Sequence, residues 1–245
     1  MTTRIAAFVS LVIVTWYLIP FAKPQAAAEG APTATNNLPV IGIQEIETDA
    51  PESYAMLVAQ NNKTMKDKFG LDNYIKVFVG ESAGPDSGKV FAVSSAESFS
   101  KMAANWTAFD QELSLVKARV DMNRVRKLGA NVTYKAVRFD GRNESSFVYN
   151  NRVMVTDEAG YLTALDGLRA LLDAHDFKDA KINCYRVVSG RTDFSHLVSI
   201  NCPSRERRAA MMDAISSEPW ASEWIFNAAK YRTVVSNGTY RQLAH

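Results

Sequence analysis

The sequence predicts an α+β fold made of two similar units, at residues 40–140 and 146–243. Each unit reads as a strand, a helix, two strands joined by a turn, a second helix and a last strand, the order βαββαβ. A repeat of this size indicates two units that pack on one another, which constrains the architecture tightly. The matching strand pairs are 74–80 with 89–94 in the first unit and 184–190 with 195–202 in the second.

The first helix of each unit is predicted between the first two strands. In the first unit, Asp49 and Glu52 suggest a capping box that starts the helix, and Gly70 ends it. In the second unit, the helix is expected to start near Asp157 and to end at His175. Apolar side chains recur on one face of both helices, so we expect each helix to cover one side of a sheet.

The second helix of each unit carries tryptophan. Ser94 and Glu97 suggest a capping box in front of the helix that contains Trp106. Ser204 is expected to open the corresponding helix, which contains Trp220. Aromatic side chains three or four residues apart on a helix most often belong to the core, and we expect the same here.

Turns and a short linker separate the remaining elements. The two hairpins turn through 81–88 and 189–193, which are rich in Gly, Ser and Asp. The last strands are predicted at 131–139 and 231–236. Residues 140–145 are the linker between the units, and a linker of this length is too short for domains that move independently.

The N-terminal segment has the pattern of a secretory signal peptide, which we assign to residues 1–28. Arg4 supplies a positive charge, residues 5–19 form an apolar run, and Ala26–Ala28 offer small residues for cleavage. The sequence therefore predicts an exported protein, periplasmic or secreted, with a flexible linker at 29–39. The alternative is an uncleaved N-terminal membrane anchor, although the run is short for a spanning helix.

The charge balance argues against two classes of partner. Removal of 1–28 takes away Arg4 and Lys23, so the basic residues fall from 28 to 26, equal to the 26 acidic residues. A chain without net charge lacks the basic surface that nucleic acids and anionic membranes require. We therefore expect no nucleic-acid partner, and no membrane association after signal cleavage.

The two cysteines, Cys184 and Cys202, fall on adjacent strands of the second hairpin. If the hairpin turns near Thr192 or Asp193, the two residues lie almost opposite each other, where a disulfide can form. In an exported protein such a bond persists, and the sequence predicts it. The alternative is a pair of buried free thiols, and a redox-active pair is disfavoured because there is no Cys-x-x-Cys spacing.

The same hairpin register divides its side chains between two faces. One face is mostly apolar and is expected to pack under the helices, whereas the other is polar, as in the wall of a cavity. The alternative is that this polar face contacts solvent. The candidate ligand-binding residues on it, together with those at matching positions of the first unit, are Tyr74, Lys76, Tyr185, Ser199 and Asn201.

The order of elements resembles the ferredoxin-like unit, and two such units in tandem resemble the dimeric α/β barrel superfamily. The resemblance covers nearly all of the chain after the N-terminal segment and rests on the order and length of the elements. It implies a pseudo-dimeric α/β barrel, in which two sheets face each other around a central cavity. Members of this superfamily include the antibiotic-biosynthesis monooxygenases, which need no cofactor, haem-degrading enzymes, chlorite dismutase-like haem proteins and the NIPSNAP group.

The histidines do not support a cofactor. Haem-binding members of the superfamily need a histidine in the cavity, but the hairpin register turns His196, the one histidine predicted on a strand, away from it. No group of Cys, His and carboxylate residues has metal-ligand spacing, and no nucleotide-binding glycine loop occurs. We therefore expect neither a metal site nor a cofactor.

Three functions are compatible with these features. The first is an exported, non-catalytic module that binds a small apolar or aromatic ligand, because no catalytic group of residues is recognisable. The second is a cofactor-independent monooxygenase-like enzyme that acts on a phenolic or quinol substrate, positioned by Tyr74, Tyr185 and Asn201. The third is a structural assembly module whose outer surfaces form a homo-oligomer.

Overall fold

The computed structural model describes residues 38–72, 74–141 and 147–243. The expected signal peptide at 1–28 and almost all of the expected linker at 29–39 lie outside the described residues. Within these described ranges, no helix is both long enough and apolar enough to cross a membrane.

The elements follow the same order in the two halves of the described chain. The first half consists of β1 (Val40–Glu47), α1 (Pro51–Phe69), β2 (Ile75–Ser82), the short 3₁₀ helix η1 (Gly84–Asp86), β3 (Val90–Ala96), α2 (Phe99–Gln111), α3 (Leu113–Met122) and β4 (Lys127–Phe139). The second half consists of β5 (Phe147–Val155), α4 (Glu158–Ala174), β6 (Lys181–Ser189), β7 (His196–Cys202), α5 (Arg205–Ser217), α6 (Pro219–Ala228) and β8 (Arg232–Gln242). The predicted strands and first helices are all present.

The strands form one closed antiparallel barrel in the order β1-β3-β2-β8-β5-β7-β6-β4. Two pairings join the halves and close it. At one seam β2 pairs with β8, and Gly80 lies opposite Tyr240. At the other, β4 pairs with β6, and Ala136 lies opposite Tyr185. The α+β barrel expected from the sequence is therefore present.

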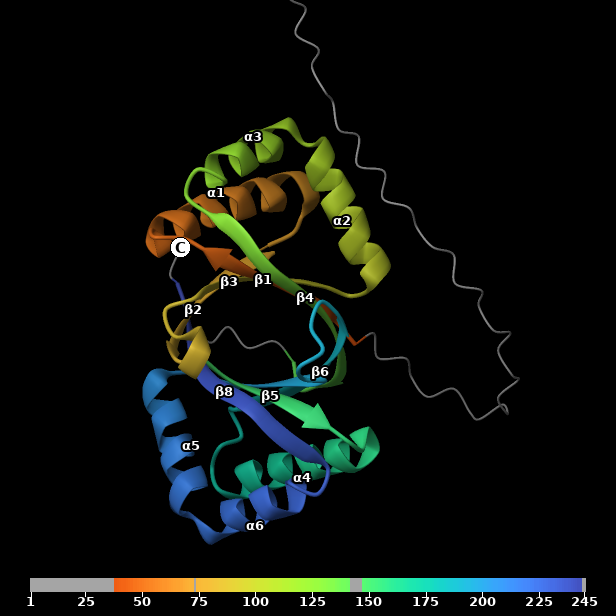
Figure 1. The fold of residues 1–245 in the computed structure, drawn as a ribbon, viewed down its shortest axis with the longest axis vertical. Helices are drawn as coiled ribbons and strands as arrows, with labels where there is room; N and C mark the ends of the chain where they lie inside the picture. Colours follow the sequence, from red (N-terminus) through yellow and green to blue (C-terminus); the bar gives the residue numbers. More distant parts are fainter. Residues whose placement is uncertain (1–37, 73, 142–146, 244–245) are drawn as a thin grey trace, which may run out of the picture. The chain divides into compact units, whose positions relative to one another are not determined.

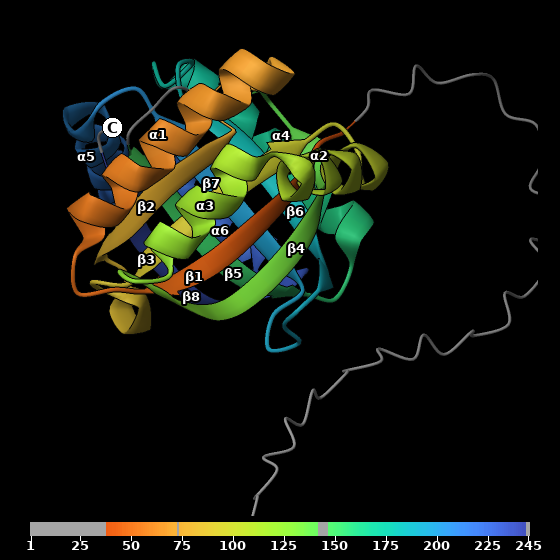
Figure 2. The same ribbon diagram turned by 90° about the horizontal axis from the view of Figure 1, so that it is seen from above.

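The helices cover the outside of the barrel in two layers. Figure 1 shows α1, α2 and α3 on one side of it and α4, α5 and α6 on the opposite side. Figure 2 shows α1 and α3 lying across the strands of the first half. Each layer packs on outward-facing strand residues: Val58 of α1 contacts a cluster with Val77, and Leu168 of α4 one with Ile182. The inward-facing side chains are left to line the interior.

The tryptophan-bearing helices differ from the prediction because each breaks into two. The backbone is extended at Glu112, between α2 and α3, and at Glu218, between α5 and α6. Pro219 explains the second break, since proline disfavours a helical conformation of the residue before it. Both predicted capping boxes are wrong. The N-cap of α1 is Ala50 without a side-chain hydrogen bond, and that of α2 is Ser98, because β3 continues to Ala96.

The predicted disulfide is also wrong. Cys184 lies opposite Val198, four residues before Cys202, and Cys202 instead lies opposite Phe147 of β5. The amide of Val187 donates to the carbonyl of Ser195, so the hairpin is centred near Arg191. The turn has no two-residue Asn-Gly type signature that would have set its register in advance. Neither cysteine forms a disulfide, both side chains are buried, and the Cys202 sulfur lies 3.8 Å from that of Met211.

Replacement of Gly190 by alanine is expected to lower the free energy of unfolding by more than about 2 kcal/mol. The residue has φ = +105°, and a β-carbon there would lie 2.0 Å from the carbonyl oxygen of Asn131, on the strand that closes the barrel. The control is Gly70→Ala, also at positive φ but with nothing within 4 Å, for which we expect a loss of about 1 kcal/mol. Urea denaturation of both variants measures this, and equal losses would contradict the close contact.

The two thiols are expected to react only after unfolding. Burial raises the pKa of Cys184 to about 12 and that of Cys202 to about 11, so neither forms a thiolate at neutral pH. Iodoacetamide should therefore leave the native protein unmodified and add two groups in urea without any reductant. Intact-mass measurement distinguishes the outcomes. If the protein in non-reducing urea gained no alkyl groups, the result would show that the two cysteines form a disulfide.

Candidate functional site

The inward-facing side chains enclose a cavity of about 200 Å³ inside the barrel. All eight strands contribute to its wall, because alternate residues of each strand point inward. For comparison, an apolar cavity of about 150 Å³ in another protein holds benzene, so a molecule of one or two rings fits here. The aromatic residues of the wall are Tyr74, Phe78, Phe91, Tyr134, Phe139, Tyr185, Phe194 and Tyr240.

The five candidate residues from the sequence all line this cavity: Tyr74, Lys76, Tyr185, Ser199 and Asn201. The two side-chain faces of the hairpin were predicted correctly, although the pairing of its strands was not. The observed pairing differs from the predicted one by four residues, and a shift by an even number leaves every side chain on the same face. Tyr74 lies at the edge of the cavity. Its ring contacts Trp106 and Phe109 of α2 at centroid distances of 6.0 and 5.3 Å, and its burial raises its pKa. The role of these residues in binding stays a prediction.

An ion pair that the sequence did not predict lies at the cavity wall. Arg152 of β5 contacts the carboxylate of Asp86 in η1 at 2.5 Å, and the Tyr240 hydroxyl donates to the same carboxylate at 2.8 Å. Burial alone would raise the pKa of Asp86, but the Arg152 and Tyr240 hydrogen bonds outweigh it and lower that pKa. Burial also raises the pKa of Tyr240, which therefore stays protonated as the donor. A turn carboxylate and a strand arginine gave no signal for this pairing.

The ring of Phe194 makes cation–π contacts with the guanidinium groups of two arginines. Arg152 and Arg191 each lie 5.6 Å from the ring centroid, and Tyr134 stacks on the ring at 6.4 Å. Burial raises the pKa of Tyr134 to about 12, against the opposing effect of Arg152. At neutral pH this part of the wall therefore presents cations and a neutral phenol.

A row of polar side chains crosses the second half of the wall. Asn150 lies opposite Ser199, and Ser199 lies opposite Asn183 on the next strand. The side chain of Asn183 already has hydrogen-bond partners, because it accepts from the amide of Asp140 and donates to the carbonyl of Gly141. The buried Oδ1 of Asn150 has no hydrogen-bond partner among the described residues. Such an acceptor is expected to meet a donor from water or a ligand.

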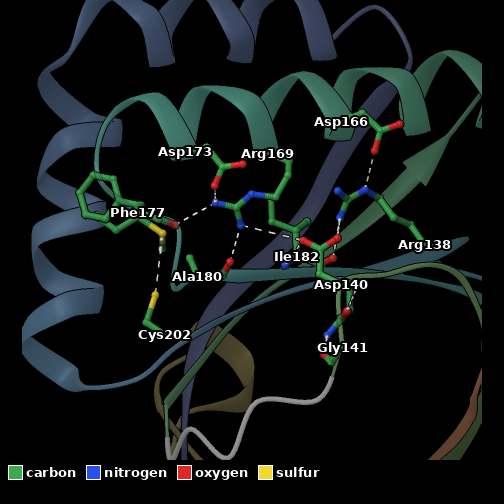
Figure 3. A network of polar contacts seen from close by, with 12 residues as sticks. Arg138, Asp140, Gly141, Asp166, Arg169, Asp173, Phe177, Ala180, Ile182 and Cys202 are labelled. Atoms are coloured by element: carbon green, nitrogen blue, oxygen red, sulfur yellow. Dashed lines mark hydrogen bonds and ion pairs between the residues drawn. The ribbon is translucent and has the colours of Figure 1, made fainter.

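A polar network outside the cavity holds the seam between β4 and β6 (Figure 3). Arg138 contacts Asp140 at 2.7 Å and Asp166 of α4 at 2.8 Å, and it donates to the carbonyl of Ile182 at 2.7 Å. Arg169 of α4 lies 3.9 Å from the other oxygen of Asp140. These contacts fix strand and helix to each other, and we assign the network a structural role.

The described residues of the cavity wall include no histidine that could hold a haem iron. His196 points away from the cavity, as expected, with one ring nitrogen 2.8 Å from Glu158 and the other 2.9 Å from Ser195. Burial lowers the pKa of His196 despite the opposing effect of Glu158. The described lining residues also include no Cys or Met. Within the described ranges, no three His, Cys, Asp or Glu residues cluster as for a metal ion.

Comparisons with known proteins support the fold. No family model matches the chain, and no curated protein matches its sequence significantly. Among solved structures, a candidate monooxygenase from Lactobacillus acidophilus superposes with a TM-score of 0.54 at 10% identity, over 84% of this chain and 93% of its own. One from Fusobacterium nucleatum gives 0.53 at 7% identity over the same shares. An anthrone oxidase-like protein gives 0.50 at 13% identity, over 86% of this chain and 93% of its own.

Replacement of Asp86 by asparagine is expected to lower the free energy of unfolding at pH 7 by about 3 kcal/mol, because it leaves Arg152 buried without a counter-charge. The lowered pKa of Asp86 means that its contribution is present at neutral pH and is lost as the pH falls through the native pKa, below the ordinary 3.8. The gap between wild type and variant should therefore narrow in acid, as followed by urea denaturation across pH.

The matched control is Asp193→Asn. Asp193 pairs with Arg191 at 2.5 Å, but its side chain is 48% exposed. An exposed ion pair contributes less than about 1 kcal/mol. An Asp86 variant no less stable than this control would contradict a stabilising role for the buried pair.

Proposed function

Because this chain has the fold of the dimeric α/β barrel superfamily, we propose that its cavity binds a small phenolic or quinol-type molecule and oxidises it with O₂, as a cofactor-independent monooxygenase. The observation that carries the proposal is the cavity itself, an aromatic-lined space of about 200 Å³ with the guanidinium of Arg152 in its wall. The candidate monooxygenases and the anthrone oxidase-like protein among the structural neighbours support this choice.

The wall suits a phenol in two ways. Its aromatic side chains, such as Phe91 and Phe194, offer ring faces and edges to a flat molecule. Arg152 is held by Asp86, so its position is set before a substrate enters. From that position its guanidinium can donate a hydrogen bond to the phenolic oxygen, and the electron-rich phenolate is the form that reacts with O₂.

The reaction balances without an external reductant. A phenol with hydrogen at the position opposite its hydroxyl is converted to a quinone. One oxygen atom of O₂ replaces that hydrogen as a carbonyl oxygen, and the other leaves as water with the two hydrogens that the substrate loses. The four electrons that reduce O₂ all come from the ring. The residues of the cavity are therefore asked only to bind, orient and ionise the substrate.

We further propose that the two halves are a tandem duplication and that the barrel is pseudo-dimeric. The matching order of elements supports this, as does the way the seams β2·β8 and β4·β6 use corresponding strands of the two halves. A single chain would then enclose a cavity of the kind that two separate chains enclose in a dimeric barrel. A homo-oligomer formed through the outer surfaces is compatible with this arrangement.

Export remains a proposal that rests on residues 1–28 alone. Their positive start, apolar run and alanine cleavage site support it. N-terminal sequencing of protein recovered from culture medium and periplasm would reveal cleavage after Ala28, whereas an intact N-terminus in the membrane fraction would favour the anchor.

The first interpretation of the sequence was a non-catalytic binding module, and none of the three structural neighbours described above is named as one. Polar residues of the cavity wall are compatible with binding alone, so the deciding measurement is turnover.

We expect the purified protein to consume O₂ with some members of a panel of monocyclic phenols and quinols. With ¹⁸O₂ and a phenol that has hydrogen opposite its hydroxyl, one labelled atom should enter the product and one should enter water. The double variant Asp86→Asn/Arg152→Met removes the ion pair without leaving a buried charge, and it should lower kcat/KM at least about a hundredfold. The control Arg186→Met removes an arginine outside the cavity, which pairs with Glu158. Absence of O₂ consumption across the panel would contradict the proposal.

A further inference from the structure

Most charged side chains in the cavity wall are neutralised by a neighbour. Glu45 contacts Lys89 at 3.0 Å, and Arg152 contacts Asp86 at 2.5 Å. Arg191 pairs with Asp193, also at 2.5 Å. These pairs leave little net charge at three places in the wall.

Lys76 differs from all of them. It lies on β2, lines the cavity and is half-buried, and no carboxylate of the described chain lies within ion-pair distance of its ammonium group. Its described neighbours are apolar or aromatic, because it lies opposite Val93 of β3, and Tyr74 and Phe78, two residues away along the chain, also line the cavity. Among the described residues that line the cavity, it is therefore the one cation without a counter-charge.

A half-buried charge without a partner is unfavourable, because the surrounding apolar groups replace only part of its hydration. A ligand that brings one negative charge would remove this penalty. The buried Oδ1 of Asn150, in the wall of the same cavity, is a second polar atom without a partner among the described residues. It accepts a hydrogen bond, so it suits a ligand that also carries a donor.

We infer that the occupant of the cavity is a monoanion, an aromatic or otherwise flat apolar molecule with one ionised oxygen group held by Lys76. This inference deepens the proposed function, because it names the ionised phenol or an aromatic carboxylate as the bound form. The cavity then contains Lys76 as the ligand's counter-ion, while Arg152 and Arg191 keep their own carboxylates.

For a phenolic substrate, the consequence is that its hydroxyl has a lower pKa when bound than when free in solution. The ammonium of Lys76 stabilises the phenolate relative to the neutral phenol, so binding itself drives ionisation. Lys76 is thus a positioning and ionising residue for the substrate. It needs no proton transfer of its own, because the proton can leave to solvent before the substrate enters.

The test uses 4-nitrophenol, whose anion absorbs at a longer wavelength than its neutral form. Spectrophotometric titration of the bound probe should show a pKa about one unit below that of the free probe, which is about a tenfold preference for the anion. Lys76→Met should abolish this shift, and Lys76→Arg should keep most of it. The control is Lys63→Met, which removes an exposed lysine on α1 and should titrate like wild type.

A second arm tests the carboxylate as the source of the charge. Isothermal titration should show benzoate binding more tightly than benzyl alcohol to wild type, and equally weakly to Lys76→Met. Unfolding temperatures establish that each variant is folded. Equal preference in wild type and Lys76→Met, or a wild type that prefers neutral compounds, would overturn the inference. If wild type and Lys76→Met oxidise phenols equally well, the inference fails while the proposed function stands. If no compound of the panel binds or is oxidised, both fail.

Discussion

Closure of the sheet is the constraint on which the rest of the structure depends. Every strand of the barrel has a partner on each side, and two seams, β2·β8 and β4·β6, complete the circle. Closure satisfies the backbone groups that would be exposed at open edges. It also separates two environments, since outward-facing residues pack under the helices and inward-facing residues enclose the cavity. The close backbone approach at Gly190 and the Arg138 network both serve the second seam.

The chemistry of the interior follows from how charge is tolerated there. Asp86 lies between β2 and β3 in the first half, and Arg152 lies on β5 in the second half. Their ion pair therefore links the two halves through side chains, whereas the two seams link them through backbone hydrogen bonds. Loss of either partner would leave the other charge buried and unpaired, so the two halves depend on both residues. Among the charged residues that the structure describes in the cavity wall, Lys76 is the exception, because none of the described carboxylates pairs with its ammonium group.

Much of this arrangement was predictable from the sequence, and the failures have physical causes. Strand and helix periodicity is local, so the elements and the two faces of the second hairpin were predicted correctly. Hairpin register depends on turn geometry, which the residues around Arg191 do not specify, and the predicted bond between Cys184 and Cys202 failed for that reason. The partner of Arg152 comes from a distant turn, and such contacts leave no periodic signal. The break before α6 does have a local signal, because Pro219 disfavours a helical conformation at Glu218.

The two unbonded cysteines have a consequence for how the molecule can mature. The chain has only these two, and both thiols lie in the apolar core under α4 and α5. No covalent cross-link therefore has to be formed, and no oxidase or isomerase has to act, before the barrel closes. Folding to the same structure can proceed in a reducing or in an oxidising solution, so the side of a membrane on which the chain folds imposes no redox requirement on it.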